Sequence, residues 1–531
     1  MTEIASPAAS RSSGRGLIRG LRRAAAWVAA RASGARSCRV FAAGFALLHA
    51  LLWTVILTVI KGAQDIHFDT AEAYEWGQRF LLGYGKHPPL SGWIAGLWFR
   101  VFPAADWAAY ALAMATLAAS LYVCFEIALR VVDRRRAAFT LVLLAVSPGL
   151  NFKGFKYNAD LVQLVTLPLI VWAFLVAFER RDWRSGIWLG LAAAAGLMTK
   201  YWALTMIGAI GLAALAHPQR LAFLRSPAPW VAVGVCAVLM VPHLYWLAQA
   251  DFLPLTYAQE AYAEFPVSVT RATIWVYVAH NIFFISLLTL ALGWTAVIGW
   301  SRLFDWPWLI ARSRAVRMSA AINIWLVQAI VAIAPPLAGF VLAIYMKADW
   351  GIPLFFLVPL CFVAIPRLRL QAISLIHIIA IWLGFTLAML AAAPVIAAKG
   401  ARGENSSLHH PVRELAQQLT TIWHQRFGTR WAIVVGFTEA AQPMSFYSAD
   451  HPDRLTQGEP WGSGLSTFDD ARRLGFIGVC DPSDAGRLPA CEAWMRDNAK
   501  GERIEVTAQR SHRGMTGRPA TWIAYVVGPG K

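Results

Sequence analysis

The chain has 531 residues, of which 58% are apolar and 15% are charged, and it contains 25 tryptophans and 28 phenylalanines. This composition exceeds what a single soluble core requires and indicates a membrane protein. The formal net charge is +18. In a membrane protein such an excess indicates topology and contact with anionic lipid, and no stacking module or basic stripe points to nucleic-acid binding.

Residues 1–39 are basic and rich in Arg, Ser and Ala. The apolar segment that follows lacks a clear small-residue cleavage site and is long enough to span a bilayer. We therefore expect a basic cytoplasmic tail followed by a retained membrane anchor.

Apolar runs recur along residues 40–397, which we expect to form a transmembrane domain. A window of roughly 19 residues gives about eleven spans, several of them short for a full crossing. The predicted fold class is mainly α, a polytopic transmembrane helical bundle with a small C-terminal α/β extracytoplasmic domain. The expected spans are 40–60, 107–130, 137–150, 159–178, 186–198, 201–216, 228–248, 274–300, 319–345, 351–366 and 371–397.

Basic residues set the expected orientation. Arginines concentrate in alternate connecting segments, such as 11–39, 130–136, 180–184 and 312–317. The positive-inside rule makes that side cytoplasmic, and an odd number of crossings then puts residues 398–531 outside. We expect a multi-pass protein of the cell inner membrane, with a cytoplasmic N-terminus and a periplasmic C-terminal domain. Most basic residues of the outer loops are lysines, which indicates either an anionic ligand or snorkelling at helix ends.

From residue 398 the composition changes to a soluble pattern. Residues 411–426 have helical periodicity, and segments 431–436 and 520–528 have the pattern of buried strands, which predicts an α/β domain over 398–531. Cys480 and Cys491 lie close together in this region. They are either a disulfide in an oxidising compartment or two unrelated thiols.

The longest outer loop, residues 61–105, carries acids directly after a membrane span. If residues 69–80 are helical, Asp69, Glu72 and Glu75 recur at a spacing of three and drift round one side of the helix. This pattern fits a catalytic group or a solvated face. His67 and His87 are candidates for a divalent-cation site with these carboxylates, although no tight ligand spacing supports one.

A second outer stretch, residues 151–164, places Lys153, Lys156, Asn158 and Asp160 at the start of a helix. These residues either bind a ligand or cap and anchor the helix.

Two further lysines stand out on the expected outer side. Lys200 interrupts apolar sequence between two short spans, where a lysine is costly unless it snorkels or meets an anion. Lys347, with Asp349 and Trp350, forms another outer cluster, or an interfacial anchor.

Several motifs resemble one family. The run AEAYEWGQRFLLGYGKHPPLSGWI resembles the first-loop signature of bacterial membrane glycosyltransferases of the C superfamily, related to the protein mannosyltransferases and to the lipid A aminoarabinose and galacturonic acid transferases. SPGLNFKGFKYNADL, GLMTKY, MKADWGIPLF and FYSADHP are similar to later landmarks of that family, in the same order. Many relatives have Asp-Glu-Ala-Tyr-Tyr-Trp where this chain has Ala-Glu-Ala-Tyr-Glu-Trp, so Ala71 replaces the usual aspartate.

The resemblance implies that a sugar moves with inversion from a polyprenyl-phosphate donor to an acceptor hydroxyl, on lipid A, core oligosaccharide or another envelope glycan or glycolipid. An alcohol needs a general base, for which Asp69 is the first choice and Glu72 the second. The departing phosphate needs fixed cations, for which the candidates are Lys86, Lys200, Lys156 and Arg79. The candidates for other substrate contacts are His87, Tyr84, Asn158, Asp160 and Lys347. Beyond the donor, the sequence identifies no certain cofactor and leaves a divalent cation open.

Two other classes of function fit parts of the pattern. A transporter or flippase of a lipid-linked sugar is the leading alternative, because charges near the bilayer can line a substrate path. That reading requires an inverted repeat and charges near the midplane, whereas these charges collect on one face. A scaffold whose outer domain binds a partner is the third reading.

Overall fold

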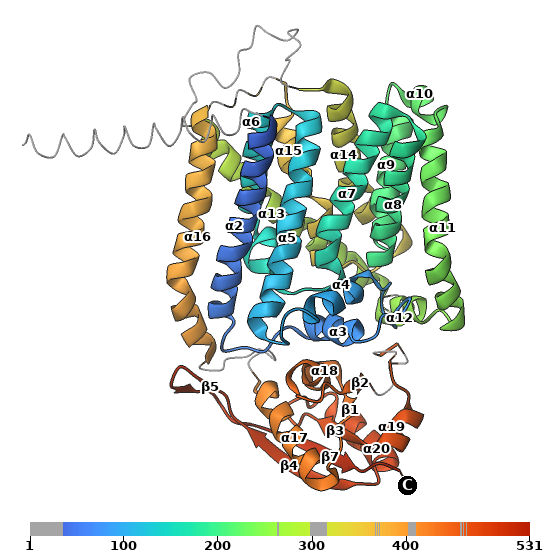
Figure 1. The fold of residues 1–531 in the computed structure, drawn as a ribbon, viewed down its shortest axis with the longest axis vertical. Helices are drawn as coiled ribbons and strands as arrows, with labels where there is room; N and C mark the ends of the chain where they lie inside the picture. Colours follow the sequence, from blue (N-terminus) through green and yellow to red (C-terminus); the bar gives the residue numbers. More distant parts are fainter. Residues whose placement is uncertain are drawn as a thin grey trace, which may run out of the picture.

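The computed structural model describes residues 35–262, 265–297, 316–366, 368, 370, 372–401, 410–456, 459, 461–462 and 465–530. Helices make up most of the chain to residue 401, and a mixed β-sheet with flanking helices follows. Figure 1 shows the helical bundle stacked on the sheet region, with helices α3 and α4 between them.

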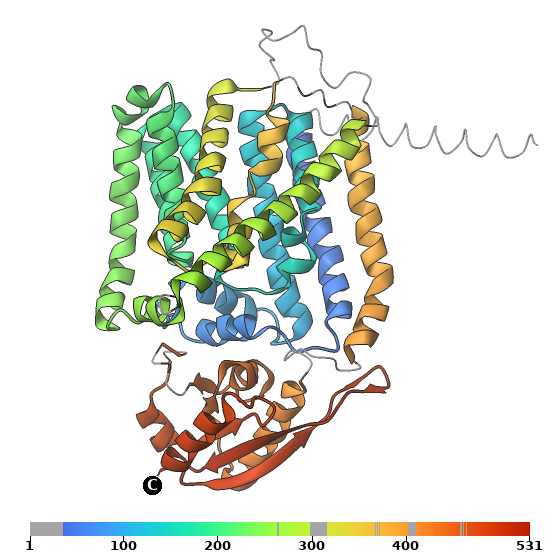
Figure 2. The same cartoon turned by 180° about the vertical axis from the view of Figure 1, so that it is seen from behind.

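Seven helices in the described part of the chain are long and apolar enough to cross a membrane, or up to eight if a bent pair counts as one span. A membrane-spanning segment must satisfy its own backbone hydrogen bonds, which a helix of this length does. The chain is therefore a multi-pass membrane protein. The seven helices are α2 (Ala35–Ile60), α5 (Asp106–Val131), α7 (Ala159–Arg180), α11 (Pro227–Gln249), α13 (Val267–Val297), α14 (Met318–Leu342) and α16 (Ala372–Ala401). Helix α13, yellow-green in Figure 2, runs obliquely across the bundle.

This number is smaller than the eleven spans expected from hydropathy, and the difference lies in the short segments. Expected span 137–150 falls in α6 (Arg134–Ala145), which bends by 83° into 3-10 turns over Pro148–Phe155. Expected span 351–366 falls in the 3-10 stretch η4 (Ala348–Leu354) and the short α15 (Val358–Val363).

The expected spans at 186–198 and 201–216 form two helices, α8 (Trp183–Thr199) and α9 (Ala203–Ala216), separated at Lys200. Lys200 has an extended backbone, so the chain changes direction at that residue. Two more short helices, α10 (Arg220–Leu224) and α12 (Leu253–Tyr262), flank α11.

The first outer segment forms α3 (Phe68–Gly77) and α4 (Leu90–Phe99), so the expected helix at 69–80 is present but ends at Gly77. The two helices cross closely at a pair of glycines. A Cβ atom on Gly77 would lie 2.4 Å from the backbone nitrogen of Gly96, so neither position has room for a side chain. This contact fixes α3 against α4 under the membrane helices.

The C-terminal region contains a five-stranded sheet in the order β2-β1-β3-β7-β4. Pairs β1/β2 and β1/β3 are parallel, whereas β3/β7 and β4/β7 are antiparallel. The expected helix and strands coincide with α17, β1 and β7. Helices α17 and α18 cover one face of the sheet, and α19 and α20 cover the other. The elements are α17 (Val412–Phe427), β1 (Ile433–Gly436), α18 (Thr438–Tyr447), β2 (Asp453–Leu455), α19 (Phe468–Leu474), β3 (Phe476–Cys480), α20 (Leu488–Asn498), β4 (Glu502–Ala508), β5 (Ser511–His512), β6 (Met515–Thr516) and β7 (Ala520–Val527).

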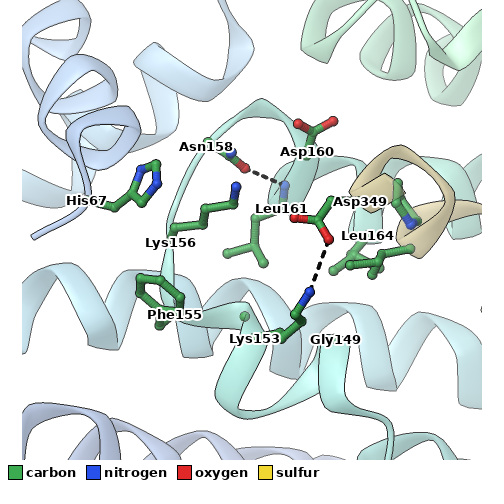
Figure 3. A pocket seen from close by; sticks show the side chains of 13 residues that line it. His67, Gly149, Lys153, Phe155, Lys156, Asn158, Asp160, Leu161, Leu164 and Asp349 are labelled. Carbon is green, nitrogen blue, oxygen red and sulfur yellow. Dashed lines mark hydrogen bonds and ion pairs between the residues drawn. The ribbon is translucent and has the colours of Figure 1, made fainter. Parts of the chain in front are cut away.

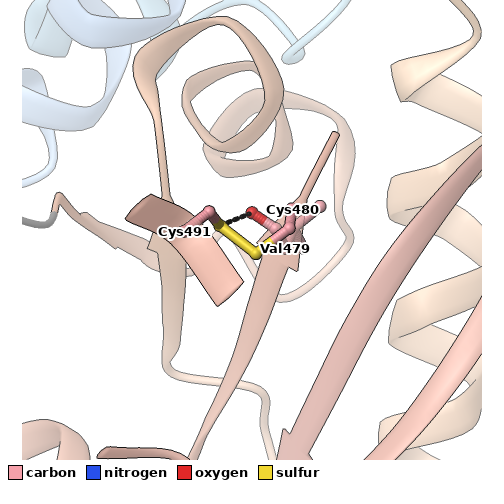
Figure 4. The surroundings of a disulfide bond; sticks show 3 residues. All are labelled: Val479, Cys480 and Cys491. Atoms are coloured by element: carbon pink, nitrogen blue, oxygen red, sulfur yellow. Dashed lines mark hydrogen bonds between the residues drawn. A yellow bond between two sulfur atoms is a disulfide. The ribbon is translucent and has the colours of Figure 1, made fainter. Parts of the chain in front are cut away.

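Cys480 and Cys491 are joined by a disulfide, which settles the alternative left open by the sequence. The bond links the end of β3 to α20, and both residues are buried (Figure 4). It therefore links α20, one of the helices that cover the sheet, covalently to strand β3.

Buried and half-buried ion pairs join the C-terminal region to the loop after α2 and to the start of α5. Arg510 donates to Asp65 in that loop at 2.5 Å, and Arg413 pairs with Asp106 in the first turn of α5. Arg510 also donates to Glu414 at 2.9 Å within the C-terminal region. Breaking such ion pairs destabilises the fold, because either charge alone would be left without its counter-charge. The C-terminal region thus has a defined position on the bundle.

Candidate active site

A polar cavity of about 460 Å³ lies where the first outer segment, the start of α7, the α8–α9 break and η4 meet. Lysines and carboxylates from all four elements line it, together with tyrosine and tryptophan rings. Its lining residues that the sequence singled out are Asp69, Glu72, Lys86, His87, Lys153, Lys156, Asn158, Asp160, Lys200, Lys347, Asp349 and Trp350.

Asp69 lies in the first turn of α3. The ring of His67 caps this helix by accepting from the Asp69 backbone N–H at 3.1 Å. The Asp69 carboxylate accepts from the side-chain amide of Asn158 at 2.9 Å, and the Lys156 ammonium lies 4.0 Å away. Burial opposes ionisation of this carboxyl, but His67, Lys156 and Asn158 outweigh burial and hold its pKa well below the ordinary value. Asp69 is therefore an ionised acceptor.

Glu72, one turn further along α3, is engaged by cations. It accepts from the Lys86 ammonium at 2.8 Å, and the guanidinium of Arg454 lies 3.5 Å from the same oxygen. Glu72 is buried and Lys86 nearly so, with 8% and 13% of their side chains exposed. Since Glu72 already has two cationic partners, its position suits it to hold Lys86 rather than to accept a proton from a substrate.

Lys200 forms a second ion pair in the lining of the cavity. Its ammonium donates to Asp160 at 2.7 Å, and Asp160 lies in the first turn of α7. The neighbouring His87 is buried, and burial together with Lys200 lowers its pKa to about 3. His87 is therefore a neutral ring beside these charges. Lys347 places its ammonium 5.0 Å from the centre of the Tyr262 ring.

A smaller cavity of about 220 Å³ adjoins the first and shares Lys153, Lys156, Asn158, Asp160 and Asp349 with it. Figure 3 shows Lys153 pointing to Asp349, a pair separated by 3.2 Å, and Asn158 capping α7 at Leu161. Its remaining wall is largely apolar.

An apolar pocket adjoins the 220 Å³ cavity on the side of α13. The two share Gly149, Leu164 and Ile352 in their walls. The polar cavity is therefore connected through shared walls to an apolar surface within the bundle, an arrangement typical of sites for amphipathic ligands.

Two residues predicted from sequence to contact substrate lie elsewhere. Arg79 does not line the cavity, because its guanidinium pairs with Asp453 and with the carbonyl of Leu465 in the C-terminal region. Tyr84 is buried, stacks on Trp76 with ring centres 5.0 Å apart, and donates its hydroxyl to backbone carbonyls of the same loop. In the described structure these side chains shape the loop that carries Lys86, so the expected substrate contacts of Arg79 and Tyr84 stay predictions.

His67 lines the smaller cavity, and His87 lines the larger one. No group of three or more His, Cys, Asp or Glu side chains suited to a metal ion occurs within the residues that the structure describes. The divalent cation stays a prediction.

Several residues of the site were missed by sequence reasoning, among them two tyrosines and an arginine. Tyr257 and Tyr262 come from α12, and both line the polar cavity. Arg454 contacts Glu72 from the C-terminal region. The local sequence gives no indication of a role for these two tyrosines or for this arginine. Only the fold brings them to the site.

Known proteins resemble part of this chain. Residues 86–246 match the family model described as dolichyl-phosphate-mannose-protein mannosyltransferase. The chain is 25% identical over 211 residues to the lipid A galacturonosyltransferase RgtD of Rhizobium johnstonii, covering 39% of this chain and 44% of that protein. It is 26% identical over 216 residues to the lipopolysaccharide core galacturonosyltransferase RgtA of the same organism, covering 39% and 41%.

The chain thus spans less than half the length of these two relatives. A crystal structure of ArnT from Cupriavidus metallidurans bound to undecaprenyl phosphate aligns with 94% of this chain and 100% of that one, at 14% identity and a TM-score of 0.49. The resemblance to membrane glycosyltransferases related to the protein mannosyltransferases, predicted from the motifs, is confirmed over residues 86–246.

Proposed function

We propose that this protein is an inverting glycosyltransferase that moves a sugar from a polyprenyl phosphate to an envelope glycolipid or glycan. One observation carries the proposal: a single cavity holds an ionised Asp69 and five lysines, among them Lys86, Lys156 and Lys200. A base for an alcohol and cations for a phosphate are what this reaction requires.

The reaction forms one bond and breaks one at the anomeric carbon. The acceptor hydroxyl oxygen attacks that carbon, its proton passes to Asp69, and the bond to the phosphate oxygen breaks with its electron pair on the phosphate. Lys86, Lys156 and Lys200 stabilise the charge that develops there. A single displacement inverts the anomeric centre.

The pKa of Asp69 is lowered by His67, by Lys156 and by the hydrogen bond from Asn158, which makes the carboxylate a weak base before the donor binds. A bound phosphate would neutralise much of the field of Lys156, so the carboxylate gains proton affinity when the donor is present. The donor thereby prepares its own base.

The surroundings of the cavity support the proposed lipid donor, and two relatives support the proposed acceptor. The polar cavity fits the phosphate and sugar of such a donor, and the small pocket beside α13, of about 40 Å³, adds an apolar surface next to it. Two relatives are named as galacturonosyltransferases for lipid A and for lipopolysaccharide core. We therefore propose lipid A or core oligosaccharide as the acceptor. We also propose a divalent cation as a cofactor, and activity after treatment with a chelator would test it.

The proposed placement is the cell inner membrane, with about eleven crossings if the short apolar helices are counted as spans. The basic segments then lie in the cytoplasm, and residues 398–531 form a periplasmic domain. The Cys480–Cys491 disulfide supports an oxidising compartment for this region.

Mass spectrometry of envelope glycolipids from cells with and without the protein tests the function. The proposal predicts that one glycolipid loses the mass of a single sugar when the protein is absent, and that purified protein restores it from a polyprenyl-phosphate sugar. Movement of the donor across a vesicle membrane without glycosidic bond formation would instead identify a flippase.

A further inference from the structure

Arg454 is a fully buried arginine on strand β2, at the contact between the C-terminal region and α3. Its guanidinium donates to the hydroxyls of Thr438 at 2.7 Å and Thr456 at 2.6 Å. A further guanidinium nitrogen lies 3.5 Å from the carboxylate of Glu72. The backbone N–H of Arg454 donates to Glu75 at 2.8 Å.

A buried guanidinium requires a counter-charge, and two carboxylates of α3 lie beside this one. Glu75 is buried next to Asp453, and these effects raise its pKa to about 8, so most of it is protonated at neutral pH. Its other oxygen accepts from the side-chain amide of Gln442 at 2.6 Å. The guanidinium of Arg454 lies at ion-pair distance from Glu72, whereas Glu75 accepts from the backbone N–H of Arg454, so Glu72 is the counter-charge that its side chain contacts.

The same oxygen of Glu72 also accepts from the ammonium of Lys86. Two cations thus share one carboxylate, and the group of three carries a net positive charge. Without Arg454, Glu72 and Lys86 would form an isolated pair with no net charge, and Lys86 would attract an anion less strongly.

We propose that Arg454 cancels the charge of Glu72 and so leaves the positive charge of Lys86 free to bind an anionic group in the cavity. Arg454 does not line the cavity, so it is a positioning residue that acts through Glu72. The inference rests on the proposed function, because it takes the anion to be the phosphate of a polyprenyl lipid.

The surroundings of Arg454 support a role tied to the Lys86 loop. Asp453, the preceding residue, pairs with Arg79 at the start of that loop. A Cβ atom on Gly85, next to Lys86, would lie 1.9 Å from the carbonyl oxygen of Trp461. The C-terminal region therefore contacts the loop that carries Lys86 both at its start and beside Lys86 itself.

Binding of undecaprenyl phosphate to the full chain in lipid nanodiscs tests the proposal. Arg454→Met should weaken binding about tenfold, the equivalent of about 1.4 kcal/mol. Glu72→Gln should bind at least as tightly as the wild type, because it removes the negative charge. The double variant restores the net charge of the group and should bind within about twofold of the wild type.

The directions of these three changes in affinity distinguish charge cancellation from a purely structural role. A structural role predicts weaker binding in both single variants and no recovery in the double variant. Arg487→Met is the matched control, because Arg487 makes an exposed ion pair with Glu439 in the same region. Arg454→Lys keeps the charge and should bind like the wild type, and it serves if Arg454→Met does not fold.

Three results would count against these ideas. Wild-type affinity in Arg454→Met, or a double variant as weak as Arg454→Met, would overturn the inference while the proposed function stands. A wild-type protein that does not bind undecaprenyl phosphate would overturn the proposed function and, with it, the inference.

Discussion

The carboxylate of Asp69 accepts a hydrogen bond of 2.9 Å from the amide of Asn158, although 89 residues separate the two in the chain. Asn158 also caps α7 by accepting from the N–H of Leu161. One side chain thus fixes the start of a membrane helix and the orientation of an acid on α3. The position of Asp69 is a property of the bundle and not only of its own loop.

Removing the charge of Lys156 should shift the acid limb of activity to higher pH. Burial raises the pKa of Asp69, but His67, Lys156 and Asn158 outweigh burial and hold this pKa below its ordinary value of 3.8. The wild-type base therefore stays ionised as pH falls toward that value. Lys156→Met removes one of the lowering effects, so the base is protonated at a less acidic pH. The pH profile of kcat/KM measures this shift. A profile that moves to lower pH, or one unchanged on its acid side, would contradict the role given to Lys156.

Lys200→Met should destabilise the protein by about 1–3 kcal/mol, because it leaves the Asp160 carboxylate without its partner in a largely buried place. Asp160→Asn in the same chain should recover part of this loss, since it removes the unpaired charge. Thermal unfolding in nanodiscs compares the single and double variants. Equal losses in Lys200→Met and in the double variant would argue against the pair.

Gly85→Ala should destabilise the contact between the Lys86 loop and the C-terminal region. Its Cβ atom would meet the carbonyl oxygen of Trp461 at 1.9 Å, and relief of such overlap typically costs about 1–3 kcal/mol. Gly208→Ala on α9 is the control, because nothing lies within 4 Å of its added Cβ and alanine favours a helix. Thermal unfolding and the KM for donor report the two effects. Similar behaviour of both variants would contradict the close approach.

Glu75→Gln should remove part of the pH dependence of stability. Burial, together with Asp453, raises the pKa of Glu75 from 4.5 to about 8 in the folded chain. The stabilising effect of its proton is fully present below pH 4.5 and is lost as pH rises through about 8. Melting temperatures across this window should fall less steeply in Glu75→Gln than in the wild type. Glu505→Gln, at an exposed site, should leave the slope unchanged.

The sequence predicted the bundle and its chemistry through local signals. Long apolar runs identified the seven longest helices, and charged residues that interrupt apolar sequence, such as Lys200, identified one wall of the cavity. Hydropathy does not determine where an apolar run breaks, so α6, α8 and α9 are shorter than the seven long apolar helices.

Contacts between distant segments could not be predicted in this way. Arg79 looked like a phosphate ligand because it lies near Lys86 in sequence, yet its partner Asp453 is 374 residues away. Arg454 had no local signal, since its role depends on β2 lying against α3. The sequence already ranked Asp69 before Glu72 as the base, and the contacts of Glu72 with Lys86 and Arg454 add support to that order.

Transfer of a labelled sugar from a polyprenyl phosphate in proteoliposomes tests the central claim most directly. Asp69→Asn should abolish transfer, by a factor of at least about 100, while undecaprenyl phosphate binding and thermal unfolding stay close to the wild type. Asp469→Asn, at an exposed position of the C-terminal region, should retain full activity. Unchanged turnover in a folded, donor-binding Asp69→Asn protein would contradict the account.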